Sequence, residues 1–255
     1  MHWFKEKKWI WILECVTIFV HVFKTVLTSK FTQFTLSSSN ARYSDNLVQH
    51  LNTSIIQCAR LCNGEDECTS VNHNADTGVC ELTTYVPGVV TPSTVAESNW
   101  NIYYDDRFVP AVDAWQQSTY VHWDVQLAAS LATDGNRGDK NKVTNELDCA
   151  HTTSSYSYWG MEFERFAEVA HVIIFFRNSS QVNNRNSNLR LLISPTRQDA
   201  DNNIGTDCAY YAGPPASPSL PVKIPCAQHV TGKFLKIIHN ADELLGLCEV
   251  EVYSV

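Results

Sequence analysis

The segment HVIIFFRNSS, residues 171–180, places a cation at the end of an apolar run. Its five consecutive bulky apolar residues, 172–176, are typical of a strand that is buried on both faces. Arg177 follows at once, and Asn178 begins a triplet that accepts an N-linked glycan, as does Asn52. We therefore expect a guanidinium at the tip of a core strand, where it either holds a loop in place or binds a ligand from solvent.

Cysteine is the other reactive residue type, and the chain has nine. Cys15 lies in an apolar N-terminal segment, and the other eight form two groups of four. An even number behind such a segment predicts disulfides formed in an oxidising compartment. Zinc binding is the alternative for the first group, whose spacing is C-x3-C-x5-C-x11-C. The groups are Cys58, Cys62, Cys68 and Cys80, and Cys149, Cys208, Cys226 and Cys248.

The sequence lacks the motifs of common enzyme classes. It contains no H-E-x-x-H, no G-x-S-x-G, no glycine-rich phosphate loop and no dinucleotide fingerprint. The formal net charge is −8, and no block of Lys or Arg occurs after residue 8. This balance argues against a nucleic acid or an anionic membrane as the partner. We expect a binding module and not an enzyme.

The N-terminus predicts a secretory signal over residues 1–30. Lys5, Lys7 and Lys8 precede an apolar stretch, 9–23, that only Glu14 interrupts. This stretch is short for a spanning helix, which needs about 20 residues. We expect secretion, with a mature start between residues 27 and 40. The alternative is an uncleaved anchor, which would make a type II membrane protein.

The elements that position these residues fall into two blocks, with a boundary near residues 98–110. In the first, Thr53 or Ser54 caps a short helix that reaches about Cys62 and ends at Gly64. Two strands follow, CTSVNHN and VCELTTY, joined by the turn NADTG. The second block has the strands HVIIFF, LRLLIS, GKFLKIIHN and LCEVEVYSV, separated by Asn, Gly and Pro clusters. It predicts an antiparallel β-sandwich.

The first block resembles the PAN/apple domain over residues 40–104. The matching stretches are IIQCARLCNGEDECTSVNHNADTGVCEL and the closing NWNIYY. The resemblance implies a small α+β domain in which Cys58 pairs with Cys80 and Cys62 with Cys68. Domains of this family recognise proteins or glycans, so the resemblance alone implies no single ligand.

The second block resembles the F-type lectins, or fucolectins, over residues 107–255. The matching stretches are LATDGNRGD, DCAHTTSSYSYWGMEF and GLCEVEVY. The resemblance implies a jelly-roll β-sandwich of the discoidin type, so the whole chain is expected to be mainly β. We expect its cysteines to pair within the block, Cys149 with Cys248 and Cys208 with Cys226.

The lectin resemblance implies a fucose site built from His151, Arg177 and Arg185. The family pattern is H-x26-R-x-D-x4-R; here 25 residues separate His151 from Arg177, and seven separate Arg177 from Arg185. Arg and His supply directed hydrogen-bond donors for sugar hydroxyls. The chain departs from the pattern at Ser179, where the family has Asp, and KNKVTNELD before His151 lacks an aromatic to pack against the sugar.

The same resemblance implies a calcium site made from three distant segments. Carboxylates, an amide and backbone carbonyls are the hard oxygen ligands that suit Ca²⁺. The alternative is that residues 134–136 form only a turn. The implied ligands are Asp134, Asn136, Asp148 and Glu249, with the carbonyls of Leu131 and Cys248.

Together these patterns predict a secreted, calcium-dependent lectin. We expect it to bind fucosylated glycans or glycoproteins, with innate immune recognition as one setting and Asn52 and Asn178 glycosylated. The alternative is a discoidin-like adhesion module that binds protein and has lost its sugar. No membrane contact is expected unless the N-terminal anchor is retained, and homo-oligomerisation is left open.

Overall fold

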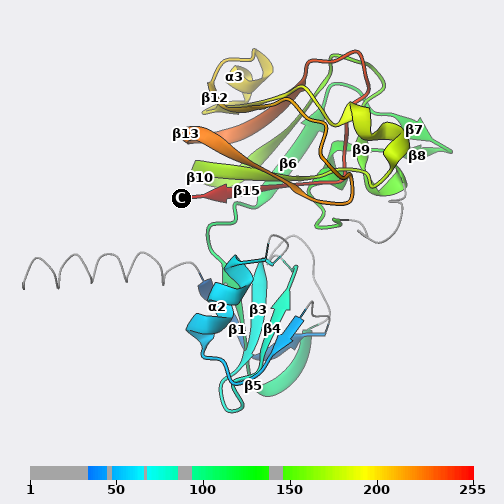
Figure 1. The fold of residues 1–255 in the computed structure, drawn as a ribbon. Helices are drawn as coiled ribbons and strands as arrows, with labels where there is room; N and C mark the ends of the chain where they lie inside the picture. The colour runs from blue at the N-terminus through cyan, green and yellow to red at the C-terminus, as the bar shows by residue number, and fades with distance from the viewer. Residues whose placement is uncertain (1–33, 45–47, 66–67, 86–93, 138–145) are drawn as a thin grey trace, which may run out of the picture.

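The structure is a computed structural model that describes residues 34–44, 48–65, 68–85, 94–137 and 146–255. The described chain forms two units that lie one above the other in Figure 1. The predicted signal or anchor, residues 1–30, lies outside the described residues. No helix in the described ranges is long and apolar enough to cross a membrane.

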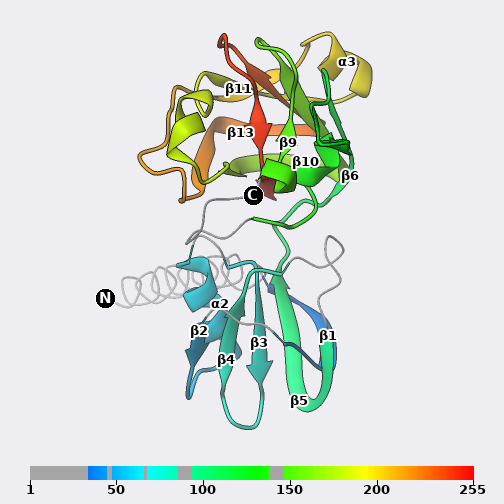
Figure 2. The same cartoon turned by 90° about the vertical axis from the view of Figure 1, so that its right-hand side faces the viewer.

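The first unit is a five-stranded antiparallel sheet with one helix packed on it, and its strand order is β1-β5-β3-β4-β2 (Figure 2). The elements are β1 (Phe34–Tyr43), β2 (Val48–His50), α2 (Ile55–Asn63), β3 (Ser70–Asn74), β4 (Cys80–Thr83) and β5 (Thr94–Asp105). Because β1 pairs with β5 along most of its length, residues 34–39, which precede the predicted start at residue 40, are also part of this unit.

Helix α2 begins and ends where its sequence predicts. Ser54 is the N-cap: its hydroxyl accepts a hydrogen bond from the Gln57 N–H, and the Gln57 side chain accepts one from the Ser54 N–H, which completes a capping box. Gly64 is the C-cap. Cys58 and Cys62 are the buried residues of the helix. Their disulfides, Cys58–Cys80 and Cys62–Cys68, confirm the predicted pairing and exclude a zinc site built from these thiols.

The second unit is a β-sandwich whose main sheet has the order β12-β11-β13-β10-β15, with β6 also paired to β10. These strands are β6 (Ala111–Gln116), β10 (Tyr158–Phe175), β11 (Leu189–Ser194), β12 (Thr206–Tyr211), β13 (Val222–His239) and β15 (Glu249–Ser254). The short elements are β7 (Val121–His122), β8 (Val125–Gln126), β9 (Ala150–His151), β14 (Gly246–Leu247), α3 (Arg197–Asp201) and the 3-10 helices η1 (Ala129–Ala132), η2 (Glu146–Asp148) and η3 (Ser180–Arg185).

Strand β10 is far longer than the predicted strand HVIIFF and serves two neighbours. Its first half pairs with β6, and its second half pairs with β15. The register against β13 breaks between Glu162 and Ala167, which separates the halves. Apolar side chains of both halves, including Trp159 and Ile174, lie in one buried cluster. The mainly β, antiparallel fold is thus confirmed, and residues 172–176 are all buried as predicted.

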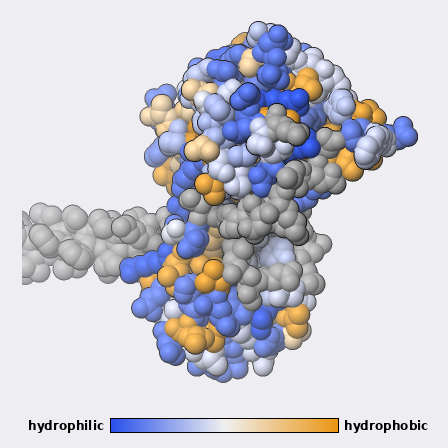
Figure 3. Space-filling model, turned by 45° about the vertical axis from the view of Figure 1, so that its right-hand side comes forward, coloured by the Kyte–Doolittle hydropathy of each residue, from blue (hydrophilic) through white to orange (hydrophobic). Residues whose placement is uncertain are grey.

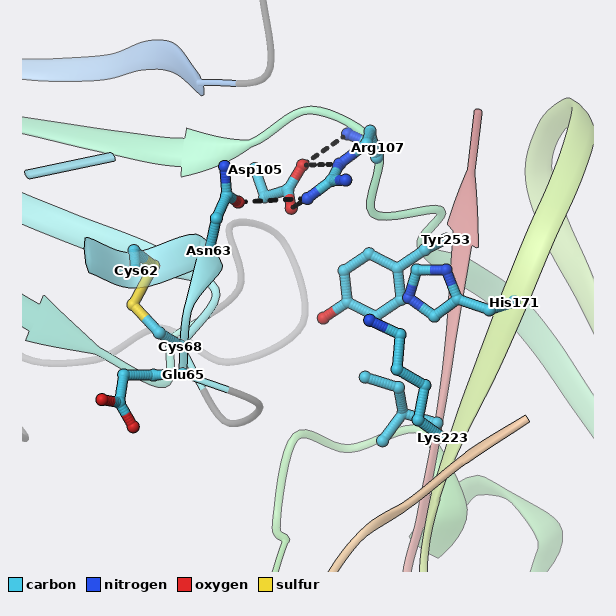
Figure 4. A pocket seen from close by; sticks show the side chains of 10 residues that line it. Cys62, Asn63, Glu65, Cys68, Asp105, Arg107, His171, Lys223 and Tyr253 are labelled. Atoms are coloured by element: carbon cyan, nitrogen blue, oxygen red, sulfur yellow. Dashed lines mark hydrogen bonds and ion pairs between the residues drawn. A yellow bond between two sulfur atoms is a disulfide. The ribbon is translucent and has the colours of Figure 1, made fainter. Parts of the chain in front are cut away.

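The two units meet along the segment that joins them. Val109 N–H donates to the Val252 carbonyl, and Ser254 N–H donates to the Arg107 carbonyl at 2.8 Å, so the segment runs beside β15. The Arg107 side chain points the other way, toward Asp105 and Asn63 of the first unit. Figure 4 shows this ion pair on one side of a small cleft, with the stacked rings of His171 and Tyr253 on the other.

Candidate functional site

Residues 243–248 lie beside all three segments that carry the predicted sugar ligands. Strand β14 in this stretch pairs with β9, where Gly246 is opposite His151. The Cys248 N–H donates to the carbonyl of Phe175, two residues before Arg177, at 2.9 Å. Arg185 Nε lies 3.6 Å from the Glu243 carboxylate. The structure therefore collects the three predicted segments around one loop, and their role in sugar binding stays a prediction.

His151 is held by its backbone on both sides. Its N–H donates to the Leu127 carbonyl at 3.1 Å, and its own carbonyl accepts from the Tyr120 N–H at 3.0 Å and from Gln116 Nε2 at 3.1 Å. Its ring packs against Gly246, where an added Cβ would lie 2.7 Å from His151 Nε2. Only glycine leaves room for the imidazole there, so the ring position is fixed by packing.

The two arginines lie on either side of Ser179. Arg177 lies two residues after the end of β10 and is partly buried, and its carbonyl accepts from the Ser179 N–H at 2.8 Å. Arg185 is the last residue of η3, and its side chain is 31% exposed. Ser179 is almost buried, at 9% exposure. Ser179 brings no carboxylate to Arg185, and the acidic neighbour of Arg185 is Glu243, from the far end of the sequence.

An aromatic residue lies beside His151, although the stretch directly before His151 has none. Tyr120, which precedes the hairpin of β7 and β8, has its ring centroid 6.4 Å from that of His151. Further rings follow along the hairpin, because His122 lies 6.2 Å from Tyr120 and Trp123 lies 4.4 Å from His122. The motif search missed this group; the available signal was the aromatic-rich stretch TYVHWD.

The predicted cation ligands also gather from three segments. The Glu249 carboxylate accepts from the Gly135 N–H at 3.1 Å, and the Asp134 carboxylate accepts from the Asn136 N–H at 2.8 Å. The disulfide Cys149–Cys248 joins the residues that follow Asp148 and precede Glu249. Residues 134–136 do form a turn, and the turn is anchored on Glu249.

Negative charge accumulates in this region. Burial raises the pKa of Glu249 well above its ordinary value, and the carboxylates of Glu251 and Asp134 raise it further. Burial also raises the pKa of Asp134, with a contribution from Asp148. Such crowding of buried carboxylates is the environment that a cation relieves.

A calcium ion would nevertheless need more than the acidic side chains. Within the described ranges, no three His, Cys, Asp or Glu side chains lie close enough to hold a metal ion by themselves. The oxygens of Leu131, Asn136 and Cys248 would have to complete the shell. Leu131 lies within η1, and Cys248 lies between β14 and β15.

Arg137 is a buried cation that sequence reasoning missed. It forms an ion pair with Glu251, and its guanidinium lies over the Phe175 ring at 4.9 Å. The Tyr253 hydroxyl donates to the second Glu251 oxygen at 2.9 Å. Glu251 is therefore neutralised from within the chain, whereas Glu249 next to it keeps an excess of negative neighbours.

The remaining disulfide predictions are confirmed. Cys149 bonds to Cys248, and Cys208 bonds to Cys226, so every described bridge lies within one unit. The long bridge ties β9 to the start of β15, and hence His151 to Glu249. The segments predicted to bind sugar and cation share this covalent support.

A comparison with protein families matches the first unit. A protein-family model described as PAN domain matches residues 33–108. Residues 33–108 therefore form a PAN domain, as the sequence resemblance implied. No curated protein matches the chain.

Several solved structures resemble part of the chain. An F-lectin (fucolectin) from the serum of striped bass, Morone saxatilis, is 18% identical, with a TM-score of 0.44, over 73% of this chain and 72% of that chain. The lectin domain of Lectinolysin complexed with Lewis b antigen is 22% identical, with a TM-score of 0.42, over 56% of this chain and 92% of that chain. A Streptococcus pneumoniae fucose binding module is 22% identical, with a TM-score of 0.42, over 56% and 93%. At these values the similarities identify no ligand for this chain.

Proposed function

We propose that this chain, a PAN domain followed by a β-sandwich, is a secreted protein that binds fucosylated glycans through His151, Arg177 and Arg185. The observation that carries the proposal is the convergence of the three segments on residues 243–248. The Arg side chains bring forked donors for sugar hydroxyls and ring oxygen. His151 adds a ring nitrogen in a position fixed by Gly246.

Calcium belongs to the proposal as a stabiliser of the loops. A bound calcium ion would supply positive charge among the carboxylates of Asp134, Asp148 and Glu249. The raised pKa of Glu249, caused first by burial and then by Glu251 and Asp134, supports this assignment. The chain's own contribution is to hold the turn at Gly135 against the start of β15.

A glycan array, followed by titration of methyl α-L-fucoside into the full chain, tests the proposal. We expect His151→Ala, Arg177→Ala and Arg185→Ala each to weaken binding at least about tenfold, since a charged hydrogen bond contributes roughly 1.5–3 kcal/mol. Asn178→Gln removes the predicted glycan and leaves Arg177 in place. Fucose binding that appears only in this variant would show a site covered by the glycan, whereas no binding in either protein would show an inactive site. Absence of fucose binding by both wild type and Asn178→Gln contradicts the proposal.

A protein-binding adhesion module is the second candidate, and one observation favours it. Arg185 already has an acidic neighbour in Glu243, and His151 is only 6% exposed. Such groups stabilise loops without any ligand. Under this alternative, Arg185→Ala lowers the melting temperature and leaves a glycan array blank for every variant.

A further inference from the structure

The tip of the β7–β8 hairpin presents a bare indole to solvent. Trp123 is 84% exposed, which makes it the most open large apolar residue in the described part of the chain. Val121 and Val125 beside it are 51% and 43% exposed. Large exposed apolar groups on a folded protein mark contact surfaces. The hairpin projects from the side of the sandwich in Figure 1.

The exposed indole is the outer end of a row of rings that starts at the proposed sugar site. The ring centroids of His151 and Tyr120 lie 6.4 Å apart, those of Tyr120 and His122 6.2 Å, and those of His122 and Trp123 4.4 Å. The two ends of the row differ in exposure: His151 is 6% exposed and Trp123 is 84% exposed. We call these four side chains the ring row.

The base of the hairpin is bonded to His151 itself. Tyr120 N–H donates to the His151 carbonyl, and His151 N–H donates to the Leu127 carbonyl. Leu127 N–H in turn donates to the Tyr120 carbonyl at 2.9 Å, which closes the hairpin. The hairpin and the backbone of His151 therefore form one hydrogen-bonded unit, so the base of the hairpin keeps a defined position relative to the proposed site.

The turn holds Trp123 in a backbone conformation that suits it poorly. Trp123 and Asp124 have φ values of 46° and 65°. Hairpin turns with two positive φ values favour Asn and Gly, and a bulky residue there is strained. Neither the positive φ of Trp123 nor the exposure of its indole favours folding. Backbone outliers of this kind concentrate at binding sites.

We propose that the ring row is an extended subsite, in which Trp123 stacks on the second or third ring of an oligosaccharide whose terminal fucose is held at His151. This inference rests on the proposed function and specifies its ligand class. Three ring-to-ring steps separate His151 from Trp123, so only a ligand of more than one ring reaches both. The indole offers an apolar face to the C–H groups of a sugar, and His122 and Asp124 offer polar atoms for its hydroxyls.

The charge of the chain favours a glycan over a membrane as the occupant. A loop that inserts an aromatic residue into a bilayer is usually assisted by basic residues that attract anionic lipids. The turn here carries Asp124, and the chain has a net charge of −8. A neutral, hydroxyl-rich ligand meets no such repulsion.

The test compares a one-ring and a three-ring ligand on the full chain by calorimetric titration. We expect wild type to bind 2′-fucosyllactose more tightly than methyl α-L-fucoside. Trp123→Ala should lose about tenfold for the trisaccharide, a typical effect of an aromatic contact, and nothing for the methyl fucoside. Trp123→Phe should keep most of the trisaccharide affinity.

Two controls keep the outcomes separate. Phe166→Ala removes another exposed aromatic residue, 59% exposed on β10, and should change neither affinity. His151→Ala should weaken both ligands. If wild type binds neither ligand, the proposed function fails and this inference fails with it. If wild type binds both and Trp123→Ala leaves their ratio unchanged, only this inference is overturned.

A vesicle experiment tests the alternative that the hairpin binds a membrane surface. Vesicles of phosphatidylcholine, with and without phosphatidylserine, are mixed with wild type and Trp123→Ala. We expect no blue shift of tryptophan fluorescence and no sedimentation with either lipid. A blue shift that Trp123→Ala abolishes would assign the hairpin to a membrane surface and overturn the glycan subsite.

Discussion

At the scale of single residues, the neighbours of a titratable group decide its charge. The ring of His171 stacks on Tyr253 with centroids 4.9 Å apart and an interplanar angle of 2°. Its burial, together with the positive charges of Lys223 and Arg107, lowers the pKa of His171 to about 4, and Asp105 offsets only part of this. The imidazole in the cleft of Figure 4 is therefore neutral at physiological pH.

His171 should make the protein less stable in mild acid. The unfolded chain protonates this group near pH 6.5 and the folded chain only near pH 4, so its contribution is complete above pH 6.5 and falls as the pH drops to about 4. The ring is partly exposed, so solvent screening reduces the effect to about 1–2 kcal/mol. His171→Phe keeps the stack and removes the titration. Denaturant melts at pH 7.5 and 4.5 should show wild type losing more stability than the variant; equal losses contradict the assignment.

The charge of Glu249 should destabilise the calcium-free protein, and bound calcium should remove that cost. Because the pKa of Glu249 is raised by burial, Glu251 and Asp134, its ionisation at neutral pH destabilises the calcium-free fold. Glu249→Gln still accepts the Gly135 N–H and carries no charge, so we expect it to be more stable than wild type in chelator, by about 1–3 kcal/mol. Added calcium should raise the melting temperature of wild type and leave the variant unchanged. A wild type insensitive to calcium would mean that Arg137 alone balances these carboxylates.

At the scale of elements, the sequence predicts those whose signals are local. Ser54 and Gly64 mark α2 correctly because capping is decided within one turn of helix. The first half of β10 is indicated only by the lectin resemblance of the stretch around Trp159, because it mixes apolar residues with Glu162 and Glu164, and its pairing with β6 is not visible locally. The hairpin at Trp123 was missed for a related reason, since Trp-Asp is an unusual turn pair.

That turn offers a prediction about the hairpin as an element. Trp123→Asn combined with Asp124→Gly installs the residues that two positive φ values favour. We expect the double variant to be more stable by about 1 kcal/mol, since a left-handed backbone costs an ordinary residue roughly 1–2 kcal/mol. Thermal melts measure the gain. A loss of stability would mean that the packing of Trp123 on His122 contributes more than the strain costs.

At the scale of the whole molecule, the sequence predicts two units and their disulfides but not how the units join. The boundary near residues 98–110 was visible as a change from an aromatic strand to charged residues and Pro110. The contacts across this boundary are not visible in the sequence, because the partners of Arg107 are distant along the chain. Its side chain binds Asn63, 44 residues earlier, and its backbone carbonyl binds Ser254, 147 residues later. Likewise, the ion pair between Arg137 and Glu251 joins residues that are distant in the sequence and meet only in the folded chain. Figure 3 shows small separate apolar groups on the described part of both units on this face.

The junction should make the PAN domain and the sandwich unfold together. Arg107 donates to the Asp105 carboxylate from Nε at 2.9 Å, and the Asp105 side chain is only 5% exposed. Arg107→Ala leaves that carboxylate buried without its main partner, which costs about 3–5 kcal/mol, and removes the bond to Asn63 as well. We expect calorimetry to show one transition for wild type and a separate, lower one for the PAN domain in the variant.

Two matched variants define the cause of that effect. Adding Asp105→Asn to Arg107→Ala should recover much of the stability, because the buried group is then uncharged. Arg190→Ala breaks a comparable pair with Asp207 whose side chains are 36% and 56% exposed, and should cost at most about 1 kcal/mol. If Arg107→Ala melts in a single transition at the wild-type temperature, the backbone bonds from Val109 and Ser254 hold the two units together without the side chain.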